Sequence, residues 1–289
     1  MKNYLVFQAY GKIEIKYECI FALLQLHTFP CFKNISPVIY TDEPEIFKEI
    51  VLLFNEYEII KLSNEQINKW KGPDKFVHRV KIEMLKDFLA KHNGNVLYCD
   101  TDTYFTESPE SLFNSIEKGM FYMHTLEGYI NHKTHPSFKK WEQFLLTHPE
   151  ILDQSGPNYV NSLPMWNAGV IGLNNGALPL LNEVLNLTDC IFKKFPKHIA
   201  EQFAFSYIFQ KHTIIYPADK YIFHYWYLKE FANYLILVFQ RNCHLNLLEK
   251  FNCINKLPAK LLEEKKQYQH NTRWIKLIAP KWNIKITEG

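Results

Sequence analysis

Two aspartates one residue apart, Asp100 and Asp102, end an apolar run that begins at Val96. Residues i and i+2 of a strand point to the same side, so both carboxylates can reach one cation while the preceding apolar side chains are buried in a sheet. Two close carboxylates without a cation resist ionisation, whereas Mg2+ or Mn2+ neutralises them and keeps positions for phosphate oxygens. The pair therefore predicts metal-dependent phosphate chemistry, with an acidic turn after a strand as the plainer alternative.

Three metal-dependent classes share such a local string. GT-A glycosyltransferases carry Asp-x-Asp at a strand end, haloacid-dehalogenase-like phosphatases carry paired aspartates after an apolar strand, and the palm of family B DNA polymerases resembles residues 98–102. A family B polymerase needs several domains, which 289 residues cannot hold. The phosphatase motif normally opens its domain, whereas Asp100 lies far from the start of this chain. A mid-chain position favours the glycosyltransferases, because the upstream strands build the nucleotide pocket first.

The elements that must position these aspartates alternate along the chain. Apolar residues at strand spacing and at helical spacing follow one another, separated by polar turns and by the Gly72-Pro73 break. Such alternation predicts an α/β fold with a mostly parallel sheet flanked by helices and with ligands at the carboxyl ends of the strands. We expect strands at 4–10, 37–42, 58–62 and 96–99 and helices at 13–26, 45–54 and 77–90.

Downstream of the aspartates, the turn at Asn167 and Gly169 runs into an apolar strand. The small residues of this turn allow a ligand to approach the backbone closely. The region from 125 to 160 shows little regularity. We further expect strands at 120–124 and 213–216 and helices at 111–118, 137–147, 178–192 and 200–210.

Composition and charge limit the class of protein. The chain is 47% hydrophobic, enough for a large core, and its six cysteines form no C-x-x-C pair. It starts without a signal-peptide pattern, so we expect a cytoplasmic protein. Residues 227–289 hold eleven Lys and Arg against five Glu, while the rest of the chain holds 22 basic and 25 acidic residues. This basic tail predicts short helices that either contact the inner face of an anionic membrane or pack on the catalytic region with a solvated basic face.

The order of four features resembles the GT-A glycosyltransferases, most nearly the family-eight-like group that includes glycogenin and bacterial lipopolysaccharide glycosyltransferases. The resemblance covers residues 3–229. It departs from the family pattern between His224 and Lys229, where this chain has no Gly. It implies a Rossmann-like GT-A domain over 1–229 and a basic helical extension over 230–289. The four features are Asp100-Thr101-Asp102, Asn167-Ala168-Gly169-Val170, Glu201-Gln202 early in a helix, and His224 followed by Lys229.

The same resemblance implies a metal site and a donor site. Mn2+ or Mg2+ would be held by Asp100, Asp102 and His224, and Lys229 would hold the diphosphate of a nucleotide-sugar donor. The acceptor would be a glycan or a lipid-linked sugar, with no nucleic-acid partner. The remaining donor-binding residues implied by the family are Ala9, Tyr10 and Asp42 at the base and ribose, Arg79 and Lys81 on the preceding helix, and Thr101 and Gly169.

Catalytic roles follow from the resemblance as well. Asn167 would lie near the donor sugar, Glu201 would act as base or nucleophile, and the Gln202 amide would position the sugar. Residues two apart on a helix diverge, so we expect one of Arg79 and Lys81 to be solvated. Three alternatives remain: the phosphatase, a nucleotide-sugar-binding protein without turnover, and a nucleotidyltransferase. A nucleotidyltransferase would need a glycine-rich phosphate loop after the first strand, and residues 8–12 contain only one glycine.

Overall fold

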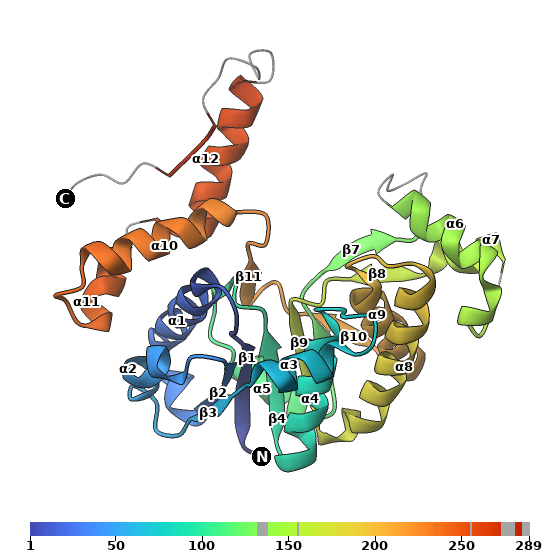
Figure 1. The fold of residues 1–289 in the computed structure, drawn as a ribbon, viewed down its shortest axis with the longest axis horizontal. Coiled ribbons are helices and arrows are strands. Elements are labelled where there is room, and N and C mark those ends of the chain that lie inside the picture. Colours follow the sequence, from blue (N-terminus) through green and yellow to red (C-terminus); the bar gives the residue numbers. More distant parts are fainter. Residues whose placement is uncertain (132–137, 155, 255, 273–280, 285–289) are drawn as a thin grey trace.

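The computed structural model describes residues 1–131, 138–154, 156–254, 256–272 and 281–284 (Figure 1). Its centre is a seven-stranded sheet in the order β10-β6-β9-β4-β1-β2-β3. All neighbouring strands run parallel except β9, which is antiparallel to both β4 and β6. The strands are β1 (Asn3–Gln8), β2 (Ile35–Thr41), β3 (Glu58–Lys61), β4 (Asn95–Cys99), β6 (Phe121–Met123), β9 (Val170–Asn174) and β10 (Ile215–Pro217).

The sheet register brings three chain segments to one edge. Phe7 of β1 is the partner of Cys99 of β4, so residues 8–10 and 100–102 leave the sheet together. Because β9 is antiparallel to β4, with Val170 opposite Cys99, the residues that precede β9 also lie at this edge. The carboxyl ends of the parallel strands thus bring these three segments together.

Helices cover both faces of the sheet (Figure 1). Central strands buried on two sides read as continuous apolar runs, which explains the composition of β1 and β4. One face packs against α1 (Ile13–His27), α2 (Lys48–Val51) and α5 (Glu110–Glu117). The other packs against α3 (Asn64–Lys71), α4 (Arg79–Lys91), α8 (Leu178–Lys194) and α9 (Ala200–His212).

Two small antiparallel pairs stand outside the main sheet. The strand β5 (Thr103–Phe105) follows the aspartates and pairs with β11 (Ile222–His224), which sets His224 opposite Thr103. The strands β7 (Leu126–Tyr129) and β8 (Pro164–Trp166) pair at the base of an excursion between β6 and β9. That excursion carries α6 (Lys139–Thr147) and α7 (Pro157–Ser162), and short 3-10 turns occupy Pro30–Asn34, Pro44–Phe47, Pro149–Ile151 and Asn175–Ala177.

The C-terminal segment is helical, as expected, with α10 (Lys229–Arg241), α11 (Leu247–Asn252) and α12 (Pro258–Asn271). The first of these joins the core, since the ring of Phe231 lies 5.0 Å from that of Phe21 on α1. In Figure 1, α12 points away from the sheet. Among the described residues, no helix has both the length and the apolar character to cross a membrane.

The expected α/β architecture is confirmed, and two local expectations are corrected. The helix expected at 45–54 is a 3-10 turn followed by a single α-turn that ends at Val51. The helix α3 escaped prediction because it buries little more than Ile67 and Trp70. Its N-cap could have revealed it, since the Ser63 hydroxyl accepts a hydrogen bond from the backbone N–H of Gln66 at 3.0 Å.

Candidate functional site

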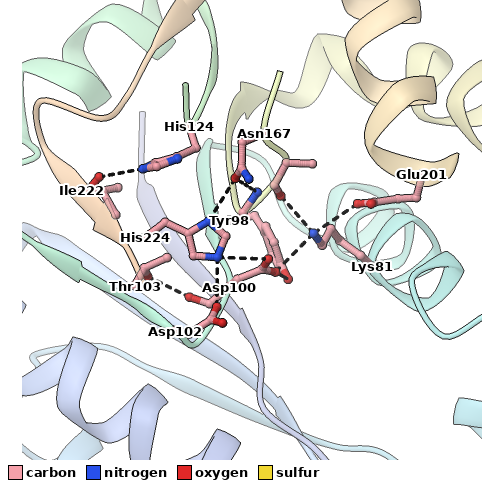
Figure 2. Close-up of polar contacts among 12 residues, drawn as sticks. Lys81, Tyr98, Asp100, Asp102, Thr103, His124, Asn167, Glu201, Ile222 and His224 are labelled. Carbon is pink, nitrogen blue, oxygen red and sulfur yellow. Dashed lines mark hydrogen bonds and ion pairs between the residues drawn. The ribbon is translucent and has the colours of Figure 1, made fainter. Parts of the chain in front are cut away.

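Asp100, Asp102 and His224 converge beyond the end of β4 (Figure 2). One potential ligand atom from each lies within 4.8 Å of the others. Backbone contacts fix the loop, because the N–H of Asp100 donates to the Gly169 carbonyl at 2.7 Å and that of Tyr225 donates to the Asp102 carbonyl at 2.9 Å. The two carboxylates and the imidazole predicted from the sequence as metal ligands are therefore brought together.

Hydrogen bonds fix the orientation of the His224 ring. Asn167 donates its amide Nδ2 to Glu127 at 2.8 Å, and its Oδ1 accepts from the Gly169 N–H at 2.9 Å and faces Nδ1 of His224 at 3.0 Å. An amide oxygen only accepts, so Nδ1 of His224 must carry a proton. The other nitrogen, Nε2, then faces the Oδ1 of Asp102 at 3.1 Å and offers a lone pair to a metal when the ring is neutral.

Gly169 makes room for the imidazole ring of His224 and does not open the strand to a ligand. A Cβ built at this position would overlap the imidazole of His224. The sequence suggested that the glycine lets a ligand approach the backbone, and the structure shows that the space is filled by the histidine. Together with Asn167, Gly169 therefore sets where His224 can lie.

Lys81 is a buried cation behind the cluster, between Asp100 and Glu201. Its Nζ donates to the Ala168 carbonyl at 2.9 Å and lies 3.2 Å from Asp100 and 3.1 Å from Glu201 (Figure 2). Burial alone would lower the pKa of Lys81, but Asp100 and Glu201 outweigh this effect and raise it. Lys81 therefore links Asp100, Glu201 and the Ala168 carbonyl from its buried position.

The carboxyl group of Glu201 points into the protein. Its side chain is 3% exposed and pairs with Lys81. Burial raises the pKa of Glu201 to about 7 even though Lys81 opposes the shift. Its neighbour Gln202 instead reaches the cavity described below and donates Nε2 to Glu127 at 2.8 Å.

Lys229 occupies the solvent side of Asp102. Its Nζ lies 3.1 Å from Oδ2 of Asp102, yet the side chain is 72% exposed. Burial opposes the ionisation of Asp102, but His224 and Lys229 together hold its pKa below the ordinary value. The lysine predicted to bind the diphosphate therefore stands beside the carboxylate of Asp102, which is predicted to bind the metal, and its ammonium group is open to solvent.

The structure does not bring Arg79 to this cluster. Its guanidinium pairs with Asp189 at 2.8 Å and Glu83 at 2.9 Å and donates to the Trp70 carbonyl at 2.8 Å. The expectation that one of the two basic residues of α4 is solvated was wrong, because the Arg79 side chain is only 12% exposed and that of Lys81 only 6%. The two side chains point in different directions from the helix, and each contacts its own set of partners within the protein.

The expected nucleotide end of the site contains a lysine that the sequence did not reveal. Lys16 of α1 is fully buried, lies 3.0 Å from Asp42 and 2.6 Å from Glu43, and donates to the Gly11 carbonyl at 3.0 Å. Asp42 also accepts from the Gly11 N–H at 3.1 Å, and Gly11 adopts a φ of 92°, which favours glycine. Asp42 therefore fastens the β1–α1 turn. The sequence did not predict Lys16 as a residue of the site, because it stands among apolar residues of a helix.

Ala9 and Tyr10 lie where the sequence placed them, at the end of β1. The Ala9 side chain is buried, and its N–H donates to the Tyr40 carbonyl at 2.8 Å. Burial raises the pKa of Tyr10 to about 12, and its hydroxyl has no hydrogen-bond partner among the described residues. Thr101 is buried within the aspartate loop.

A cavity of about 1030 Å³ opens beside the cluster of Asp100, Asp102 and His224. One wall carries the metal-binding and sugar-contacting residues predicted from the sequence, which are Asp100, Asp102, Asn167, Gln202, His224 and Lys229. The opposite wall comes from α6 and from the segment joining α8 to α9. Glu127, which anchors both Asn167 and Gln202, was missed because a single Glu in an irregular region carries no pattern.

Among solved structures, the chain is similar to apo mouse xyloside xylosyltransferase 1, with 15% identity, coverage of 75% of this chain and 85% of that one, and a TM-score of 0.51. It also matches galactosyltransferase LgtC in complex with donor and acceptor sugar analogues, with 13% identity, 73% and 72% coverage and a TM-score of 0.49. The Mn/GDP form of core-mannan synthase A from Aspergillus fumigatus matches with 12% identity, 78% and 75% coverage and a TM-score of 0.48.

Identities this low define a shared fold, and of these three structures only the xylosyltransferase exceeds a TM-score of 0.5. The sheet order and the similarity to the xylosyltransferase give the chain the GT-A fold, which confirms the fold expected from the sequence. Neither a family model nor a curated protein matches the chain.

Proposed function

We propose that this protein is a metal-dependent glycosyltransferase that moves a sugar from a nucleotide-diphosphate donor, with UDP as the expected nucleotide, to a glycan or lipid-linked acceptor. The observation that carries the proposal is the Asp100, Asp102 and His224 cluster, which stands at the carboxyl edge of a GT-A sheet and lines a cavity large enough for a sugar nucleotide. Cytoplasmic polysaccharide assembly is the setting that we propose for this activity.

The donor set fits a divalent cation. Two carboxylate oxygens and one imidazole nitrogen suit Mn2+ or Mg2+, and the Asn167 contact leaves Nε2 of His224 as the ligating nitrogen. When bound, such an ion acts as a Lewis acid on the departing diphosphate. Lys229, whose ammonium group is exposed, supplies a further positive charge to the phosphates once a cation takes its place at Asp102.

The residues around the cluster divide into those that contact the donor and those that hold the contacting residues in place. We assign Gln202 and Asn167 to the donor sugar, because both line the cavity and both are oriented by Glu127. Glu201 and Lys81 are positioning residues in this proposal, since they face each other behind Asp100. Preorganised polar groups of this kind lower the cost of binding the transition state.

The test is thermal stability with a panel of nucleoside diphosphates and sugar nucleotides, each with Mn2+ and with EDTA. A ligand at a hundred times its dissociation constant adds about 2.7 kcal/mol to the free energy of unfolding. We expect one nucleotide to raise the melting temperature with Mn2+ but not with EDTA. Asp102→Asn should abolish the rise and Asp74→Asn, a matched change at an exposed carboxylate, should keep it.

Failure of every nucleotide to stabilise the wild-type protein would refute the proposal. Release of free nucleotide from the stabilising sugar nucleotide, measured over time, then separates an enzyme from a binding protein without turnover. We expect slow hydrolysis of the donor in the absence of an acceptor, and its loss in Asp102→Asn.

A further inference from the structure

The wall of the cavity opposite the metal-binding cluster is basic. Lys140 of α6 and Lys197, between α8 and α9, are exposed side chains that line this wall, and His198 lies beside them. Lys197 stands over the ring of Phe195 at 5.6 Å. Among the described residues, neither lysine forms an ion pair with a carboxylate of the protein.

The acids that line the cavity already have binding partners. Asp100 and Asp102 bind the divalent cation of the proposed function, and both carboxylate oxygens of Glu127 accept hydrogen bonds from Asn167 and Gln202. The cation and Lys229 serve the donor diphosphate. Lys140 and Lys197 are therefore the positive charges of the cavity that neither the protein nor the donor uses.

Aromatic side chains stand beside these lysines. Phe138 and Trp141 line the same wall but are only 4% and 3% exposed, whereas Trp226, which lines the cavity after β11, is 51% exposed and offers its ring to a ligand. Flat aromatic surface is suited to the C–H face of a sugar ring, while nearby cations bind anionic substituents of that ring. The cavity thus combines exposed cations with an exposed aromatic ring, the contacts that a charged saccharide needs.

We infer that the acceptor is a saccharide with an anionic substituent, a phosphate, sulfate or carboxylate group, which Lys140 and Lys197 bind. This inference rests on the proposed glycosyltransferase function and names the class of its acceptor. The anionic group contacts the ammonium groups of Lys140 and Lys197, and the sugar ring packs on the exposed ring of Trp226.

The experiment measures binding of the full chain, with Mn2+ and the stabilising nucleotide, to immobilised glycans in matched pairs. N-acetyllactosamine is paired with its sialylated and its sulfated forms, and mannose with mannose 6-phosphate, so that carboxylate, sulfate and phosphate are distinguished. We expect at least one charged member to bind roughly tenfold more tightly than its neutral partner, and the difference to shrink as salt screens the charges.

The variant Lys140→Ser/Lys197→Ser should lose this preference. Lys139→Ser/Lys193→Ser removes the same charge from exposed positions outside the cavity and should retain it. Stabilisation by nucleotide and Mn2+ should be unchanged in both variants, because neither lysine pair touches the metal-binding cluster.

Equal binding of neutral and charged members, or a preference that persists in Lys140→Ser/Lys197→Ser, overturns the inference. So does the absence of binding to every charged glycan by a protein that the nucleotide stabilises. Absence of stabilisation by nucleotide is a different result, which refutes the proposed function itself.

Discussion

Two buried lysines organise the two ends of the site in the same way and differ in what surrounds them. Lys81 stands at the metal end and Lys16 at the expected nucleotide end, and each bridges two carboxylates and one backbone carbonyl. The partners of Lys81 include Glu201, at 3% exposure, whereas those of Lys16 are Asp42 and Glu43, at 28% and 54%. Water can therefore replace Lys16 as a partner of its carboxylates but cannot reach Glu201.

The largest effect should come from Lys81→Met. Removing the ammonium group leaves Glu201 buried without its charge partner, and breaking a buried pair in this way costs roughly 3–5 kcal/mol. Denaturant unfolding of the variant measures the loss. Lys86→Met on the same helix, where the pair with Glu83 is 23% and 21% exposed, should lose less than about 1 kcal/mol. Equal losses in the two variants would show that the buried pair of Lys81 and Glu201 contributes no more to stability than the pair of Lys86 and Glu83.

The next effect is a pH dependence. Folding raises the pKa of Glu201 from 4.5 to about 7, so the folded state holds this proton more tightly than the unfolded state does. The contribution of Glu201 to the free energy of unfolding is then greatest below pH 4.5 and falls as the pH rises through about 7, by at most about 3 kcal/mol. Glu201→Gln still accepts from Lys81 but cannot titrate, and should flatten this slope in unfolding curves. An unchanged slope would assign the pH dependence to other groups.

Lys16→Met should lower the free energy of unfolding less, because water can hydrate Asp42 and Glu43 once the lysine is gone. We expect a loss of about 1–2 kcal/mol, most of it from the Gly11 carbonyl and the like charges left adjacent. Adding Asp42→Asn removes one of those charges and should recover part of the loss. If Lys16→Met lowers the free energy of unfolding as much as Lys81→Met does, the exposure of the partner carboxylates does not determine how much each lysine stabilises the protein.

The smallest change in stability should follow Lys229→Met. Its ion pair with Asp102 is exposed on the lysine side and contributes about 0.5 kcal/mol or less. Mn2+ affinity, measured by calorimetry without nucleotide, should rise a few-fold because the cation no longer competes with an ammonium group. Weaker Mn2+ binding would contradict the arrangement in which Lys229 stands at the cation's place.

The sequence predicted the strand-bearing parts of this molecule better than its connections. Long apolar runs such as residues 96–99 show their burial directly, and the two aspartates follow such a run. The roles of Lys16 and Glu127 were not predictable, because each depends on partners far away in the chain. The sequence alone also could not show that Glu201 faces inward and Gln202 the cavity, since adjacent helical residues differ in direction only relative to a known neighbour.

The pairing of β5 with β11 also decides when the site can form. His224 and Asp102 are separated by 122 positions, and contacts of such separation form late because long loops must close first. During synthesis the segment with both aspartates leaves the ribosome well before residues 222–229 do. A nascent chain therefore has its carboxylates without the histidine, and it gains a three-ligand cation site only after most of the sheet has been made.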